Sequence, residues 1–158
     1  MRIIGIDPGT GILGFGVLEK ESSKLSMLDA GVIRTSSKQS DAERLKIIYD
    51  ELAEIIKQNK PDVMAVEKLF FAQNVTTAMT VSQARGAVML CGVQHGLQVF
   101  EYTPLQIKQS ITGYGRADKN QIQQMVKTIL KLDSIPKPDD CADALACAIT
   151  HAFTSKYA

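Results

Sequence analysis

Residues 1–11 read MRIIGIDPGTG, and they predict a buried strand followed by a turn. The apolar run before Asp7 is typical of a strand, and Pro8 with Gly9 predicts the turn. A carboxylate at the end of a buried strand is unfavourable unless a partner compensates its charge. Three interpretations of Asp7 follow: it binds a metal ion, it binds a nucleotide phosphate through a metal ion, or it only stabilises its own turn.

The pattern along the chain predicts an α/β fold with one mixed sheet covered by helices on both faces. Three strands joined by short polar links come first, which favours antiparallel pairing, and helices then alternate with further strands. The predicted strands cover residues 2–7, 13–20, 24–34, 62–69 and 97–102, and the predicted helices cover residues 41–59, 74–94, 104–112, 118–132 and 139–153. Asp41 is the predicted N-cap of the first helix.

The composition restricts the class of protein. A length of 158 residues predicts one domain, spanning residues 1–158. No apolar run is long enough to span a membrane, and the first strand leaves no room for an export signal. The three cysteines lack CxxC spacing, which argues against a disulfide framework or a zinc site. These features predict a cytoplasmic protein.

Carboxylates recur where predicted elements begin or end. Glu67 follows the buried run of the fourth strand, and Asp140 and Asp143 lie three residues apart on one face of the last helix. Four acids in one cleft would repel one another, and a divalent cation removes that penalty. Oxygen ligands suit Mg²⁺ or Mn²⁺, and a pair of ions roughly 3.5–4 Å apart can hydrolyse a phosphodiester. Taken singly, each acid is equally well explained as a turn former, a strand-end charge or a helix cap.

A basic segment covers residues 102–132, where five basic residues stand against one acidic residue, Asp118. The basic residues are Lys108, Arg116, Lys119, Lys127 and Lys131. Such a segment fits either a polyanion-binding surface or a solvated helix face. The helix at 74–94 carries more apolar surface than one sheet face needs, which fits either a two-fold dimer or a fully buried helix.

Long blocks of this sequence resemble the RuvC family of Holliday-junction resolvases. In order, they are GIDPGTGILGFGV, AVEKLFFAQN, TVSQARGAV, VFEYTPLQIKQSITGYGRADKNQIQQMV and DDCADALACAITH. The resemblance implies a ribonuclease-H-like domain, a homodimer, and Mg²⁺-dependent nicking of two opposed strands of four-way junction DNA. It further implies 5′-phosphate and 3′-hydroxyl ends, a role in recombination and repair, and the branch-migration proteins RuvA and RuvB as partners.

The resemblance also assigns site residues. The family's metal-binding, catalytic acids fall on Asp7, Glu67, Asp140 and Asp143, and the step of three residues selects Asp140 over its neighbour Asp139. The catalytic basic residues near the scissile phosphate fall on Lys108 and Lys119, with Arg116 as a further DNA-binding residue. The aromatic that contacts bases at the junction centre falls on Phe70. The given sequence ends at Ala158, so we expect no counterpart of the extended tail of longer relatives.

Three other functions use parts of the same pattern. An actin-like nucleotide-binding protein shares the Asp-x-Gly-Thr turn, but it closes two lobes around its nucleotide and this chain is long enough for one. A non-catalytic junction-binding protein would need the basic segment and Phe70 but not four acids. Another ribonuclease-H-like nuclease would share the metal site, and the sequence blocks around Lys108 and Lys119 distinguish the resolvases from it.

Overall fold

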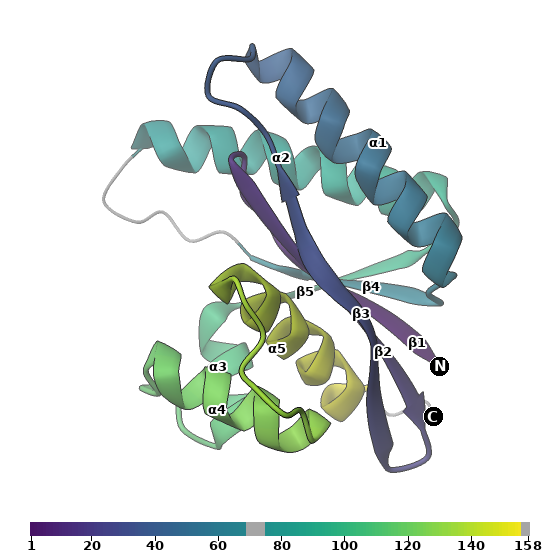
Figure 1. Ribbon diagram of the computed structural model, residues 1–158, viewed down its shortest axis with the longest axis vertical. Coiled ribbons are helices and arrows are strands. Elements are labelled where there is room, and N and C mark those ends of the chain that lie inside the picture. The colour runs from purple at the N-terminus through teal and green to yellow at the C-terminus, as the bar shows by residue number, and fades with distance from the viewer. Residues whose placement is uncertain (69–74, 156–158) are drawn as a thin grey trace.

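Five strands form one mixed sheet with helices on both faces (Figure 1). The computed structural model describes residues 1–68 and 75–155. The strand order is β3-β2-β1-β4-β5, in which β1, β2 and β3 pair antiparallel and β4 and β5 run parallel to β1. The predicted mixed sheet, with three antiparallel strands followed by parallel ones, is confirmed.

The elements begin and end close to their predicted bounds. The strands are β1 (Arg2–Asp7), β2 (Ile12–Glu21), β3 (Lys24–Arg34), β4 (Val63–Glu67) and β5 (Gln98–Tyr102). The helices are α1 (Asp41–Asn59), α2 (Val75–Gln94), α3 (Pro104–Thr112), α4 (Lys119–Leu130) and α5 (Asp139–Thr154). The predicted N-cap of α1 was wrong, because Ser40 and Glu43 form a reciprocal capping box that leaves Asp41 in the first turn.

The sheet separates two hydrophobic clusters. Helices α1 and α2 cover one face, and α3, α4 and α5 cover the other (Figure 1). Successive side chains of a strand point to opposite faces, so Ile4 and Ile6 pack under α1 and α2, whereas Ile3 packs on the side of α5. No helix in the described ranges is long and apolar enough to cross a membrane.

Helix α5 packs unusually close to the sheet because β1 and β2 carry glycines beneath it. A Cβ atom at Gly5 would lie 2.1 Å from the carbonyl oxygen of Ala144, and one at Gly14 would lie 2.1 Å from that of Asp140. Real Cβ atoms do not approach oxygen so closely, so any larger residue would push the helix away. The helix is correspondingly buried, with every residue from Ala144 to Ala152 buried.

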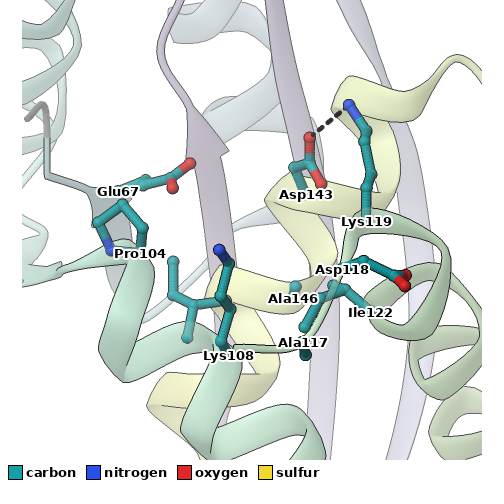
Figure 2. A pocket seen from close by; sticks show the side chains of 10 residues that line it. Glu67, Pro104, Lys108, Ala117, Asp118, Lys119, Ile122, Asp143 and Ala146 are labelled. Carbon is teal, nitrogen blue, oxygen red and sulfur yellow. Dashed lines mark ion pairs between the residues drawn. The ribbon is translucent and has the colours of Figure 1, made fainter. Parts of the chain in front are cut away.

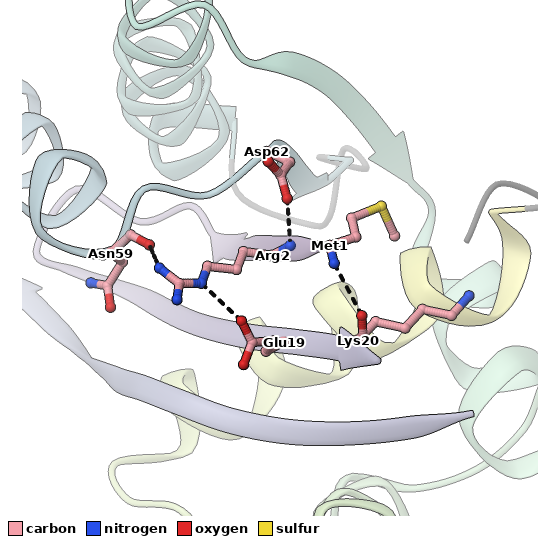
Figure 3. Close-up of polar contacts among 6 residues, drawn as sticks. All are labelled: Met1, Arg2, Glu19, Lys20, Asn59 and Asp62. Carbon is pink, nitrogen blue, oxygen red and sulfur yellow. Dashed lines mark hydrogen bonds and ion pairs between the residues drawn. The ribbon is translucent and has the colours of Figure 1, made fainter. Parts of the chain in front are cut away.

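Polar contacts fasten the opposite, amino-terminal end of β1 (Figure 3). The Arg2 side chain pairs with Glu19 of β2 at 3.1 Å and donates to the carbonyl oxygen of Asn59 at 3.0 Å. The Arg2 backbone N–H donates to Asp62 at 2.7 Å, just before β4 begins. These contacts join the amino-terminal end of β1 to β2 and to the segment just before β4. They lie at the end of β1 opposite to Asp7.

Candidate active site

Asp7 and Glu67 end neighbouring parallel strands. Ile6 of β1 pairs with Val66 of β4, so the residues that follow them come side by side at the carboxyl edge of the sheet. Alternation along the strands also places both acids on the α5 face, because the residues before them, Ile6 and Val66, belong to the cluster on the opposite face. This edge is where the ligands of open α/β sheets bind.

Helix α5 brings the other two acids to the same edge. Asp140 lies in its first turn, directly over Gly14, and Gly14 is the strand partner of Asp7. Asp143 follows three residues later on the same side of the helix. The absence of a side chain at Gly14 therefore lets Asp140 and Asp143 come within electrostatic range of Asp7.

This crowding shifts the pKa values of the acids. Burial, followed by the charges of Glu67, Asp143 and Asp140 and a hydrogen bond with Glu67, raises the pKa of Asp7 to about 8. Burial also raises the pKa of Glu67, although the hydrogen bond with Asp7 and the charges of Lys108 and Lys119 oppose that shift. At neutral pH Asp7 is therefore the protonated partner, and it donates a hydrogen bond to the carboxylate of Glu67.

A cavity of about 330 Å³ opens beside these acids. Glu67 and Asp143 face it from opposite sides, and Lys108 of α3 points into the space between them (Figure 2). Asp118 and Lys119, at the start of α4, complete the charged lining, and the floor is apolar, with Ile107, Ile122 and Ala146. Three acids and two lysines thus surround one cavity, next to Asp7.

Lys119 is ion-paired in this arrangement. Its Nζ lies 3.4 Å from Asp143 Oδ2 and 3.3 Å from Asp139 Oδ2. Partial burial lowers the pKa of Lys119, but the two carboxylates outweigh it and the pKa is raised. Burial raises the pKa of Asp143, against the opposing charge of Lys119. The sequence analysis selected Asp140 over Asp139. The spacing of four residues between Asp139 and Asp143 is the signal that would have placed these two acids on the same side of α5.

The remaining predicted residues lie elsewhere. Arg116 is exposed in the α3–α4 connection and does not line the cavity. Phe70 lies outside the described residues. Cys147, one turn beyond Asp143, is fully buried, and burial followed by the charges of Glu67 and Asp7 raises the pKa of its thiol well above the usual value. Cys147 is therefore a neutral packing group beneath the acids.

The donor set fits a hard divalent cation. All four acids offer oxygen ligands, and Asp7 carries a proton that a cation would displace. In the described ranges no group of three or more His, Cys, Asp or Glu side chains is already arranged to hold a metal ion.

Two acids lie at the carboxyl ends of neighbouring strands, and a helix packed across the sheet carries two more. This arrangement defines a ribonuclease-H-like nuclease. Residues 3–151 match the family described as crossover junction endodeoxyribonuclease RuvC. The chain therefore belongs to the RuvC family. This membership agrees with the predicted fold and excludes the actin-like interpretation of the Asp-x-Gly-Thr turn.

Individual relatives agree with the family match. The crossover junction endodeoxyribonuclease RuvC of Alkaliphilus oremlandii is 55% identical, over 99% of this chain and 96% of that protein. Its Finegoldia magna counterpart is 54% identical over the same shares of the two chains. The structure of Thermus thermophilus RuvC in complex with a Holliday junction substrate superposes with a TM-score of 0.91 and 39% identity, covering 97% of this chain and 93% of that one. A fowlpox virus resolvase, at 14% identity, covers 98% of this chain and all of its own with a TM-score of 0.62, and so shares the fold.

Asp7→Asn is expected to stabilise the metal-free protein. The pKa of Asp7 rises from 3.8 to about 8 on folding, so its ionisation destabilises the fold progressively between those pH values and not below them. Removing the charge should raise the melting temperature in EDTA by about 5 °C near pH 8. The gain should shrink toward pH 4, and thermal unfolding followed by circular dichroism measures it. An unchanged or lower melting temperature near pH 8 would contradict the assignment of repulsion at this site.

Proposed function

We propose that this chain, as one ribonuclease-H-like domain spanning residues 1–158, resolves four-way DNA junctions by cutting two opposed strands in recombination and repair. The observation that carries the proposal is the convergence of Asp7, Glu67 and Asp143 with Lys108 and Lys119 at one sheet edge, in a member of the RuvC family. The complex of Thermus thermophilus RuvC with a Holliday junction substrate supports DNA of that shape as the substrate. A cytoplasmic location follows from such a substrate.

The acids would hold Mg²⁺, or Mn²⁺ in its place, and two ions in each site. When bound, such ions activate a water molecule and stabilise the leaving 3′-oxygen of a phosphodiester, giving 5′-phosphate and 3′-hydroxyl ends. Asp7 and Glu67 would supply ligands from the sheet, and Asp140 and Asp143 from α5. Asp7 would lose its proton as it becomes a ligand, which removes the repulsion that raises its pKa.

The cationic side chains would hold the DNA strand against these acids. Lys108 points into the cavity, where it can meet a phosphate and offset negative charge that builds up during cleavage. Lys119, at the rim, would act on the same phosphate, and the exposed Arg116 would contact the backbone further along. Phe70 would contact bases at the junction centre, as the family resemblance implies.

A second copy of the chain would bind through α2. Successive residues of an α-helix are rotated by about 100° around its axis, and on this basis the exposed apolar residues of α2 fall within an arc of roughly 60°. Gly86 lies near the centre of that arc. They are Val75, Met79, Leu90 and Val93, each at least 54% exposed. A Cβ atom at Gly86 would have nothing within 4 Å, so a partner helix can approach there. Two such stripes crossing at Gly86 are self-complementary about a two-fold axis, which mirrors two symmetric cuts. RuvA and RuvB are the further partners that the family implies.

The wild-type chain should nick a synthetic four-way junction in Mg²⁺ at two symmetric positions. The products should be sealed by a DNA ligase, which requires 5′-phosphate and 3′-hydroxyl ends at the nick. Asp7→Asn should cut at least about a hundredfold more slowly, because a ligand contributes more than the outer groups that support it. Gel analysis of end-labelled strands measures both, with a linear duplex of the same sequence as the control. Equal cutting of the duplex, or wild-type cutting by Asp7→Asn, would refute the proposal.

Leu90→Glu should separate the dimer into chains of 17.3 kDa, because it places a charge within the apolar stripe, one turn from Gly86. Light scattering after gel filtration measures the mass, and the junction assay should show that paired cuts are lost. Leu28→Glu is the matched control, since Leu28 is also exposed (42%) but lies on β3. A variant at Leu90 that stays dimeric would exclude α2 as the interface.

A further inference from the structure

Lys119 is shared between two carboxylates that lie one helical turn apart on α5. Its Nζ is 3.3 Å from Asp139 Oδ2 and 3.4 Å from Asp143 Oδ2. The Asp143 side chain is 28% exposed and lines the cavity, whereas that of Asp139 is 55% exposed and does not line it. One partner of Lys119 therefore belongs to the reaction site, and the other lies outside it.

Asp139 differs from the other carboxylates of this region in its effect on Asp7. The carboxylates that raise the pKa of Asp7 are Glu67, Asp143 and Asp140. Asp139 acts instead on Lys119 and on Asp143. It lies in the first turn of α5, where the N-cap is Pro138 without a side-chain cap, and its carboxylate reaches across to α4. Asp139 thus pairs with Lys119 without belonging to the proposed ligand set.

Helix α4 contains no acidic residue that could pair with the Lys119 ammonium. Lys119 is the first residue of the helix, and the partial positive charge of a helix N-terminus disfavours a cation there. The neighbouring carboxylate of Asp118 accepts the backbone N–H of Gln121 at 2.8 Å as the helix cap. A lysine side chain also has large rotational freedom, which must be restricted before it can act on one phosphate. The position of Lys119 therefore depends on α5.

We propose that Asp139 is a positioning residue for Lys119. This inference rests on the proposed function, in which Asp143 gives its carboxylate to a cation and holds Lys119 less strongly. Asp139 then keeps the Lys119 ammonium at the cavity rim, facing the scissile phosphate. The other N–H groups of that ammonium are free to donate to the phosphate. Asp139 touches neither the cation nor the DNA.

The test compares Asp139→Asn with Asp133→Asn, which removes the same charge from the α4–α5 connection, where Asp133 lines a hollow beside Met27 and Ala30. Asp139→Asn should lower kcat for junction cleavage about fivefold, a typical coupling between contacting residues, while KM stays unchanged. Asp133→Asn should leave kcat unchanged. In a Lys119→Gln background, Asp139→Asn should produce no further loss, because its effect acts through Lys119.

A measurement without cleavage accompanies the kinetics. In EDTA, ¹⁵N relaxation of the Lys119 ammonium should show greater mobility in Asp139→Asn than in the wild type or in Asp133→Asn. Wild-type kcat in Asp139→Asn, or an equal further loss in the Lys119→Gln background, would overturn the inference. The absence of cutting by the wild type would instead refute the proposed function, so the two failures are distinct.

Discussion

The close contact of α5 with the glycines of β1 and β2 is the constraint on which this site depends. Gly14 lies beneath the Asp140 backbone and pairs with Asp7, so the absence of one side chain sets how near two acids come. Gly5 allows the next turn of the helix to approach equally closely. The core packing on this face and the electrostatics of its edge are therefore consequences of the same contact.

That contact has an unfavourable electrostatic consequence. The folded chain holds Asp7 protonated at neutral pH, since burial and three neighbouring carboxylates raise its pKa to about 8. This electrostatic penalty lies at the carboxyl end of β1, whereas the hydrogen bonds and ion pair of Arg2 stabilise the amino-terminal end of the same strand. Strain concentrated where chemistry occurs is typical of functional sites, and here a bound cation is what would relieve it.

The sequence predicted the sheet and the position of its acids because those depend on local patterns. Asp7 and Glu67 each follow a short apolar run, and two acids spaced three apart must share a helix face. The pairing of Lys119 with Asp139 was not predictable, because it depends on how α4 packs on α5. The Ser40 cap was missed because two adjacent residues are both good caps. The role of Phe70 stays a prediction from the family resemblance.

The central claim is that the clustered acids exchange a proton for a divalent cation. Calorimetric titration of the wild-type chain with Mn²⁺, in two buffers of different ionisation enthalpy, measures the protons released on binding. With the pKa of Asp7 at about 8, binding near pH 7 should release about one proton per site, and less near pH 9. Binding without proton release near pH 7, or no binding at all, would contradict the account.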